Sequence, residues 1–386
     1  GTSYVAGVVG ICYGMIEGCV NEASIAASAT SATYAGGVAG RLYGTATNCR
    51  NTGNVQAKNT VGGVAGGLSS DGLIVSATNT GSVGAETSNA GGLCGVAENN
   101  AEVRNSVNKG SVSGAYNIGG AVGAFSGKGT LDGLRNEGNV NAASTATTSS
   151  YGVGGLIGNS SAGGTVAGGV NLGAVSGSVQ NTGGVVGYMT LAGAARACYN
   201  GGTVTGSASR DASAIGGVVG AVNNNQCAVS GSYNTGAVSH SGTYSAHIGP
   251  ILGRYLPTGA PDAGKYTGNY YAEGSVSASV TVVVGTVVTE ANREAVRTLL
   301  SGITDERVVL SMNGYPVPFI LYDGPIATGD ADSDTKVTLV DALLCARAVI
   351  GQATFTEAQM IATDMDRDEK LTLVDALAIA RKIIMG

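Results

Sequence analysis

Two twelve-residue segments near the C-terminal end of the sequence carry carboxylates at the same spacing. Each has aspartate at positions 1, 3, 5 and 12, lysine at position 7 and threonine at position 9. Ca²⁺ takes six to eight oxygen ligands from a tightly wrapped loop, and the residue at position 7 supplies its backbone carbonyl. The spacing therefore predicts two calcium sites. Their candidate ligands are Asp330, Asp332, Asp334, Lys336, Thr338 and Asp341 in the first loop, and Asp364, Asp366, Asp368, Lys370, Thr372 and Asp375 in the second.

Each loop leads into a segment that has the composition of a helix. Residues 340–347 and 374–381 are rich in alanine and leucine, and their apolar residues recur at helical spacing. An alternative interpretation is a helical hairpin whose aspartates only cap the helix N-termini, where carboxylates are favoured. Two nearly identical copies, 34 residues apart, favour calcium binding.

A calcium loop followed by a helix, present twice, resembles a dockerin domain over roughly residues 327–386. The resemblance implies a small all-α module that binds two calcium ions and plugs a secreted protein into a cohesin domain. Two departures accompany it. Residues 326–329 cannot form the helix that precedes a complete calcium hand. Loop position 6 holds Thr335 and Glu369 where glycine is usual, which implies weaker calcium binding.

The same region carries two matching apolar pairs, Leu339-Val340 and Leu373-Val374, just before the last aspartate of each loop. In well-known dockerins this pair often bears hydroxyl groups. The match predicts a quasi-symmetric apolar surface that could bind a cohesin in either of two orientations. The candidate contact residues are Leu339, Val340, Leu343, Arg347, Leu373, Val374, Leu377 and Arg381.

The charge of the 386-residue chain is unevenly distributed. Residues 1–286 carry 11 acidic and 11 basic side chains, whereas residues 287–386 carry 15 acidic and 9 basic ones, which accounts for the net charge of −6. The neutral N-terminal region lacks the basic surface that nucleic acids require. No apolar run reaches the ~18 residues of a membrane span. We therefore predict neither nucleic-acid binding nor a membrane span.

Residues 1–280 are rich in glycine and repeat a short pattern. Gly-Gly-apolar-apolar-Gly occurs seven times between residues 36 and 220, and each copy is followed by Asn-x-Gly-x-Val. Fixed columns of small and branched apolar residues predict short strands that stack from coil to coil. The predicted fold class is mainly β, a parallel β-solenoid of about nine coils. We expect its glycines and Asn-x-Gly turns to adopt left-handed conformations at the corners.

The glycine blocks resemble the GLUG motif repeats of bacterial surface adhesins and secreted peptidase-associated regions, over residues 1–280. This resemblance implies extracellular display and binding. Residues 281–326 are predicted to form a small α/β cap and linker, because an open terminal coil exposes strand edges. Within and beside this segment we expect a strand at 280–288, a helix at 290–300 and a hairpin at 307–321. Residues 327–386 complete the division as the dockerin.

The solenoid offers few candidates for chemistry. Arg104 and Asp132 share a column in neighbouring coils and could belong to the charged cluster of a polysaccharide-cleaving enzyme, although a cross-strand ion pair explains them equally well. Cys19 and Cys49 also share a column, at a spacing within disulfide range. The only two histidines, His240 and His247 in a serine-rich segment, are expected to be solvated loop residues. No metal or triad spacing is evident on the solenoid.

Tyr199 and Tyr233 occupy one column in successive coils and are a possible platform for a glycan or a host ligand, with a packing ladder as the alternative. We expect a secreted, non-catalytic adhesin or binding rod that its dockerin attaches, at the cell surface, to a cohesin-bearing, cellulosome-like assembly. Two other functions stay open. One is a polysaccharide lyase or glycoside hydrolase on a β-helix; the other is a structural spacer or filament that self-associates through its N-terminal end.

Overall fold

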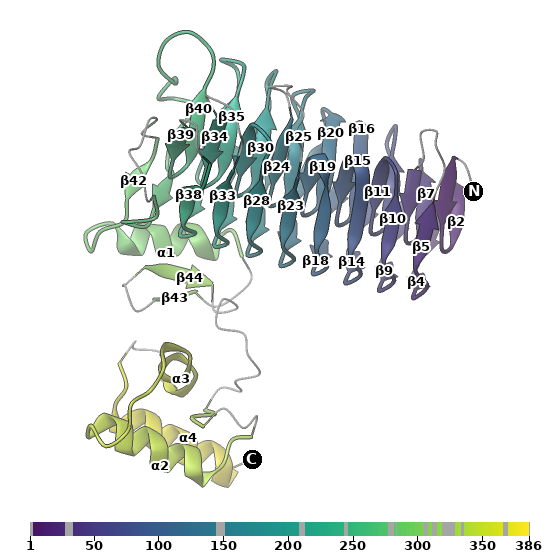
Figure 1. Ribbon diagram of the computed structural model, residues 1–386. Helices are drawn as coiled ribbons and strands as arrows, with labels where there is room; N and C mark the ends of the chain where they lie inside the picture. The colour runs from purple at the N-terminus through teal and green to yellow at the C-terminus, as the bar shows by residue number, and fades with distance from the viewer. Residues whose placement is uncertain are drawn as a thin grey trace. The chain divides into compact units, whose positions relative to one another are not determined.

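The computed structural model describes residues 3–27, 34–143, 151–207, 213–242, 246–276, 282, 284–304, 308–310, 315–318, 329–332, 336–365 and 370–385. The chain divides into two compact units, Gly1–Ile303 and Thr304–Gly386. The first unit is a β-solenoid and the second is mainly helical (Figure 1).

The described strands of the first unit pair in parallel with the equivalent strands of adjacent coils. A sheet of fifteen strands contains two stacks, which share the long strands β15 (Val83–Gly91) and β19 (Val112–Gly119). The other strands of one stack are β5 (Ile25–Ala27), β10 (Val55–Ala57), β23 (Val140–Ala142), β28 (Val175–Gly177), β33 (Val204–Gly206) and β38 (Val238–His240). Those of the other stack are β1 (Tyr4–Ala6), β6 (Tyr34–Gly36), β11 (Thr60–Gly62), β24 (Gly152–Gly154), β29 (Asn181–Gly183), β34 (Ser213–Gly216) and β39 (Ala246–Gly249).

Three further sheets complete the coils. A nine-stranded sheet contains β2 (Val9–Cys12), β7 (Ala39–Leu42), β12 (Ala65–Leu68), β16 (Cys94–Asn99), β20 (Val122–Gly127), β25 (Ile157–Ser160), β30 (Val186–Met189), β35 (Val219–Val222) and β40 (Leu252–Tyr255). An eight-stranded sheet contains β3 (Met15–Glu17), β8 (Thr45–Thr47), β13 (Leu73–Val75), β17 (Glu102–Arg104), β21 (Thr130–Asp132), β26 (Thr165–Ala167), β31 (Ala194–Arg196) and β36 (Ala228–Ser230). A ten-stranded sheet contains β4 (Val20–Asn21), β9 (Arg50–Asn51), β14 (Thr78–Asn79), β18 (Val107–Asn108), β22 (Arg135–Asn136), β27 (Val170–Asn171), β32 (Tyr199–Asn200), β37 (Tyr233–Asn234), β41 (Tyr270–Tyr271) and β42 (Thr286–Val287).

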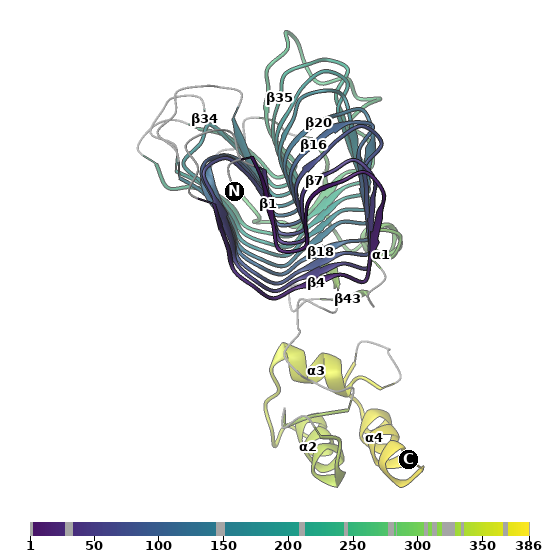
Figure 2. The same cartoon turned by 90° about the vertical axis from the view of Figure 1, so that its right-hand side faces the viewer.

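The described coils confirm the predicted parallel β-solenoid, with about eight full turns that superimpose when the solenoid is viewed along its axis (Figure 2). Its interior is built as the columns predicted. The valine four residues after each asparagine faces inward, as at Val55, Val83 and Val112, and is at most 1 % exposed. The residues on either side of these valines alternate with them in exposure, as a period of two requires.

The asparagines of the repeat form a buried ladder. Except at the last member, Asn234, each Nδ2 donates to the Oδ1 of the next asparagine at 2.7 or 2.8 Å. Each Nδ2 also donates to the backbone carbonyl two residues on. The ladder therefore satisfies side-chain amides that would otherwise be costly to bury. Its members are Asn21, Asn51, Asn79, Asn108, Asn136, Asn171, Asn200 and Asn234.

The prediction that the Asn-x-Gly turns are left-handed is wrong. Each coil instead has a left-handed residue three positions before the ladder asparagine, in a column that includes Asn48, Ser76 and Gly133, with φ of 53°, 54° and 59°. The glycine after the asparagine is needed for close approach instead. A Cβ on Gly110 would lie 2.0 Å from the carbonyl oxygen of Gly81 in the preceding coil.

The Gly-Gly block is likewise required because two backbones approach closely there. It forms the tight turn between strands such as β6 and β7, where the backbones of two sheets meet (Figure 2). A Cβ on Gly37 would lie 2.3 Å from both the Asn51 side chain and the carbonyl oxygen of Gly63. None of these paired glycines has a positive φ among the described residues. The expectation of left-handed glycines is therefore wrong for the Gly-Gly block, but it is confirmed three positions before the ladder asparagines, at Gly18, Gly133, Gly168 and Gly231.

Elements of the predicted cap are present. Of the strand predicted at 280–288, the described residues form only β42, which extends the ten-stranded sheet, and helix α1 (Arg293–Ser301) buries Val296 and Leu300. In the second unit, β43 (Val308–Leu310) and β44 (Pro316–Pro318) form an antiparallel pair, as predicted for the hairpin. The predicted boundaries of the three domains stay a prediction.

Three helices follow in the second unit: α2 (Leu339–Val349), α3 (Glu357–Thr363) and α4 (Leu373–Met385). Helices α2 and α4 pack through residues at equivalent positions of the duplication, Ala342 and Cys345 on one and Ala376 and Ile379 on the other. Among the described residues, no helix is both long and apolar enough to span a membrane.

Candidate calcium and partner-binding site

Each loop is joined to its helix by a cap that the last aspartate completes. Thr338 is the N-cap of α2, and its hydroxyl accepts a hydrogen bond from the Val340 amide at 3.2 Å. The Asp341 carboxylate accepts from the Thr338 amide at 2.6 Å and from its hydroxyl at 3.1 Å. This capping box holds Asp341 at the start of the helix with its carboxylate turned towards the loop.

The other oxygen of Asp341 braces the beginning of the loop. It accepts from the amides of Ala331 at 2.7 Å and Asp332 at 3.2 Å. Burial alone would raise the pKa of Asp341, but the amides of Thr338, Ala331 and Asp332 and the Thr338 hydroxyl outweigh it and lower the pKa. The carboxylate is therefore held in its charged form, which is the form that binds a cation.

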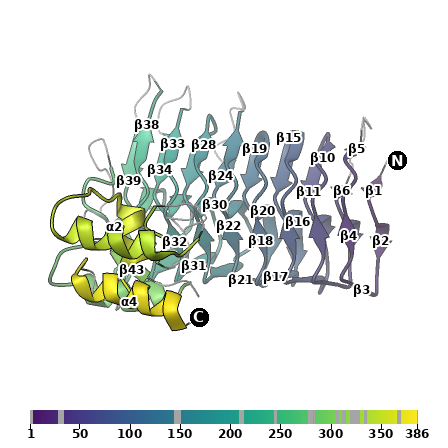
Figure 3. The same cartoon turned by 90° about the horizontal axis from the view of Figure 1, so that it is seen from below.

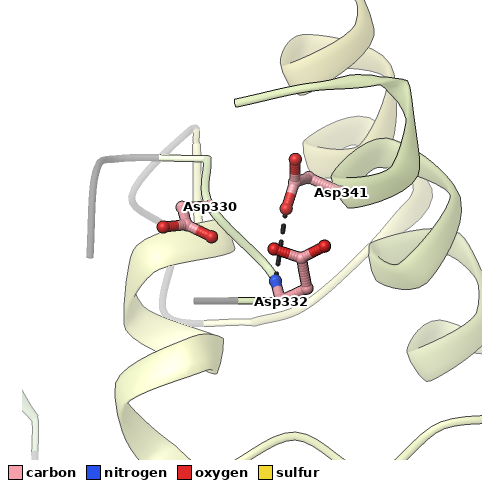
Figure 4. Close-up of side chains that lie close together, drawn as sticks. All are labelled: Asp330, Asp332 and Asp341. Carbon is pink, nitrogen blue, oxygen red and sulfur yellow. Dashed lines mark hydrogen bonds between the residues drawn. The ribbon is translucent and has the colours of Figure 1, made fainter. Parts of the chain in front are cut away.

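Three carboxylates converge at this point (Figure 4). Asp330, Asp332 and Asp341 each offer an oxygen, and these oxygens all lie within 4.8 Å of one another. Asp330 and Asp341 are fully buried, whereas Asp332 is exposed. The structure thus brings together the first, second and last ligands that the spacing predicted. Asp334 lies outside the described residues.

The second loop repeats the arrangement. The Asp375 carboxylate accepts from the amides of Met365 and Thr372 at 2.7 and 2.8 Å, and from the Thr372 hydroxyl at 3.0 Å. Asp364 and Asp375 are both buried. Asp366 and Asp368 lie outside the described residues.

The donor set of the first loop fits calcium. Charged carboxylates buried within a few ångströms of one another repel unless a cation neutralises them. Every side chain that could bind the ion would do so through a hard oxygen atom. Such ligands suit Ca²⁺ rather than a metal that prefers thiolate or imidazole ligands. The cap does not compete with the ion, because a carboxylate has about four lone-pair sites. The two loop lysines, Lys336 and Lys370, are exposed.

The capping alternative and the calcium interpretation are therefore compatible. Asp341 and Asp375 do take part in capping their helices, as the alternative proposed. Capping does not account for Asp330, which lies eight residues before the N-cap and is completely buried. Thr338 and Thr372, predicted as ligands, here serve as caps, and their hydroxyls donate to the final aspartates.

The apolar positions predicted to contact a cohesin are exposed to the same degree in both halves. Leu339 and Leu373 are 60 % and 58 % exposed, and Leu343 and Leu377 are 59 % and 54 % exposed. The whole exposure pattern of residues 339–347 repeats at 373–381. Val340, Val374, Arg347 and Arg381 also face solvent.

Sequence reasoning missed part of this surface. Ile350 and Ile384 are 60 % and 78 % exposed and lie seven residues after Leu343 and Leu377, so each extends the same face of its helix. A groove of about 460 Å³ lies on this surface; its lining residues are Leu343, Ala346, Arg347, Ile350, Gln352 and Leu373. The i, i+7 spacing was the signal that could have identified both isoleucines.

Helix α3 was also missed. It begins at Thr356 with a capping box to Gln359, the Thr-x-x-Gln pattern that marks a helix start. The Gln359 side chain donates to the Ala331 carbonyl at 2.7 Å, and the Gly329 amide donates to the Ala362 carbonyl at 2.7 Å. Helix α3 therefore supports the first loop and leads directly into the second.

The prediction that Tyr199 and Tyr233 form a ligand platform on the solenoid is wrong. The Tyr199 and Tyr233 rings lie 5.6 Å apart, but both side chains are 0 % exposed. The Tyr199 hydroxyl is 2.6 Å from the Thr235 hydroxyl. The packing alternative is correct, because fully buried rings offer no face to a ligand.

The other chemical candidates on the solenoid have ordinary structural settings. Arg104 and Asp132 are paired in register, but Arg104 forms its ion pair with Glu102 on its own strand.

Cys19 and Cys49 are free thiols rather than a disulfide. His240 and His247 belong to strands β38 and β39 and are half-buried, so the loop assignment is wrong.

Comparison with known proteins agrees with both resemblances. Residues 328–384 match the dockerin type I domain, and residues 86–113 match the GLUG motif. No curated protein matches the chain. A solved structure from Bacteroides ovatus, assigned provisionally as an immunoglobulin A1 protease, is similar at 17 % identity and a TM-score of 0.39, over 78 % of this chain and 74 % of that one. The protein is thus a β-solenoid with a GLUG motif, followed by a C-terminal dockerin type I domain.

Proposed function

We propose that this protein is a secreted, non-catalytic binding rod, which its dockerin domain attaches to a cohesin-bearing assembly outside the cell. The observation that carries the proposal is the presence, in one small domain, of a cluster of three convergent carboxylates, two of them buried, and two equivalent exposed apolar helix faces. Dockerin type I domains bind calcium, and a dockerin implies a cohesin partner.

In the proposed mechanism, the aspartates of the two loops would hold calcium and so fix the N-terminal ends of α2 and α4. Asp330, Asp332 and Asp341 would hold the first ion, and Asp364 and Asp375 would contribute to the second. A bound ion neutralises the carboxylates, so each loop stays wrapped against the helix N-terminus that its aspartate caps. The exposed leucines and valines then stand at fixed positions for a partner.

The function is tested by capture of the full chain on a panel of immobilised cohesins, in calcium and then in chelator. We expect capture by at least one cohesin in calcium and none in chelator. Leu339→Asp with Val340→Asp alters one half, and Leu373→Asp with Val374→Asp alters the other. Because the halves are equivalent, we expect capture to survive either pair and to be lost when both are combined. Capture that is unaffected by chelator would contradict the mechanism.

The non-catalytic part of the proposal is tested separately. The full chain is incubated with a panel of plant and host glycans, and released reducing ends are measured. We expect no release above the buffer control. Release that disappears in an Arg104→Ala, Asp132→Ala variant would favour a polysaccharide-cleaving enzyme instead.

A further inference from the structure

Helix α3 lies between the two calcium loops and is attached to both of them. Its C-cap is Asp364, the first candidate ligand of the second loop, and the Asp364 amide donates to the Met360 carbonyl at 3.0 Å. The last turn of α3 therefore sets the position at which the second loop begins. The Met365 amide then donates to the Asp375 carboxylate at 2.7 Å, so the start of this loop is held on both sides.

The other attachment runs from α3 to the first loop. The Gln359 side chain donates through Nε2 to the Ala331 carbonyl at 2.7 Å. Ala331 lies between the candidate ligands Asp330 and Asp332, and its amide donates to the Asp341 carboxylate at 2.7 Å. The peptide groups on either side of Ala331 are therefore both restrained, one by the last aspartate of the loop and the other by α3.

Gln359 is itself fixed by the start of α3. Its Oε1 accepts from the Thr356 amide at 2.9 Å and from the Thr356 hydroxyl at 3.0 Å. Because an amide side chain is both donor and acceptor, this one residue joins the N-terminal end of α3 to the first loop. The duplication of the loops does not predict the link, since the residue 34 positions before Gln359 is Pro325, whose side chain has no donor.

The two attachments lie near opposite ends of a helix that is too short to be stable alone. Helix α3 has seven residues, and isolated helices shorter than about 12–15 residues are marginal in water. Its order therefore depends on contacts at its ends. When Asp364 is held at one end, less conformational entropy remains to be lost at the other, where Gln359 restrains the first loop. Order in either loop thus favours order in the other.

A second route between the loops is the packing of the helices that follow them. Helices α2 and α4 lie side by side (Figure 3). They pack through Ala342, Cys345, Ala376 and Ile379. Substitution of Gln359 leaves this packing in place, so an experiment can separate the two routes.

We propose that Gln359 is a positioning residue of the first calcium loop and that it couples the two loops through α3. Calcium in one loop then strengthens calcium binding in the other. This inference rests on the proposed calcium-dependent function of the dockerin and adds its regulation. Such coupling is reciprocal by thermodynamic necessity, and we expect it to change each affinity by about tenfold.

The test is calcium titration of the full chain by isothermal calorimetry, with the metal ion alone as the probe. Asp364→Asn disables the second loop and gives the affinity of the first loop, and Asp330→Asn gives the affinity of the second. The coupling factor is the overall affinity of the unmodified chain for two ions, divided by the product of the two single-loop affinities. We expect a factor of about ten.

The same cycle is then measured with Gln359→Met, which removes the donor to Ala331 and changes no charge. We expect the coupling factor to fall below about two. The matched control is Thr356→Ala, which weakens the same capping box but does not remove the Gln359 donor to Ala331, and its factor should stay at about ten. A purely structural role of Gln359 would lower the single-loop affinities without changing the coupling factor.

Two results would overturn the inference. One is a coupling factor below about two in the unmodified chain, and the other is an equal factor with and without the Gln359 side chain. If Gln359→Met binds no calcium at either loop, Gln359→Glu replaces it, because glutamate keeps the acceptor for Thr356 and lacks the donor for Ala331.

The outcome for the proposed function is read separately, from cohesin capture of the unmodified chain. Two bound ions and intact capture without coupling would reject this inference alone. An unmodified chain that binds no calcium would reject the proposed dockerin mechanism as well.

Discussion

The solenoid and the dockerin domain both bury polar side chains at a fixed repeat, and they stabilise them by opposite means. In the solenoid, the buried residues are neutral asparagines, and each amide is both donor and acceptor, so the ladder is satisfied within the protein. In the dockerin, the buried residues are aspartates such as Asp330 and Asp341, which are acceptors only. A column of amides can complete itself, whereas a cluster of carboxylates needs an external cation.

This difference predicts that the two regions respond differently to a chelator, and we expect the effect to exceed that of any single substitution in the solenoid. In the full chain, chelation should lower hydrogen-exchange protection of α2 and α4 by about 100-fold when calcium had been present at about 100 times its Kd, because binding then stabilises the folded form by about 2.7 kcal/mol. Protection of β16 and β20 in the solenoid should not change. Equal loss in both regions, or in neither, would contradict the comparison.

The ladder itself is tested by Asn136→Leu. This change removes the donor to Asn171 and the acceptor for Asn108, and we expect the free energy of unfolding to fall by about 2 kcal/mol. The matched control is Asn234→Leu at the end of the ladder, where Asn200 is the only asparagine that loses its ladder partner. Chemical denaturation should show a smaller loss for the control. Equal losses would mean that the ladder is not cooperative along its length.

Charge should matter less in the solenoid than in the dockerin. Glu98 links three coils, since it accepts from Arg41 at 2.6 Å and from the Ser69 hydroxyl at 2.8 Å. We expect Glu98→Gln to lower the free energy of unfolding by about 1 kcal/mol, and by less at high salt, as chemical denaturation can measure. Glu294→Gln is the control, because the Glu294 side chain in its pair with Arg297 is 80 % exposed, and it should cause no measurable change.

The smallest effect concerns the buried thiols. Burial raises the pKa of Cys94 and of Cys198 to about 12. At pH 8, iodoacetamide should therefore label the half-exposed Cys19 in the native protein but not these two, as peptide mass spectrometry can show. Because their folded pKa is raised, the two thiols contribute stability below the unfolded pKa of about 8.5, and this contribution is lost as the pH rises towards 12. Faster labelling of Cys198 than of Cys19 would contradict the assigned burial.

The sequence predicted the features that depend on a repeating spacing. The valine columns and the parallel stacking follow from residues that recur at fixed distances, and the structure confirms both. The dockerin domain is confirmed as well, and Asp330, Asp332 and Asp341 converge as the spacing predicted, whereas the binding of two calcium ions stays a prediction. The exposed faces of α2 and α4 were also predictable, because burial on a helix follows its period. Helix α3 was missed because a single capping box in a short segment is a weak signal beside two strong motifs.

The roles of individual polar residues were less predictable. Asparagine followed by glycine is a common left-handed turn, and nothing local distinguishes it from an asparagine that bonds to its own copy about 29 residues later. The prediction of a tyrosine platform also failed because it depended on contacts that the local sequence does not specify. A column assigns Tyr199 and Tyr233 to neighbouring strands but does not say whether other parts of the chain cover them.

The sequence by itself determined that the chain stacks short parallel strands and ends in two equivalent acidic loops, because both follow from the period of its side chains along the backbone. Only the tertiary structure decided which polar groups satisfy one another and which glycines are required by close backbone contact. These depend on distances between coils, and such distances are set when the backbone closes on itself.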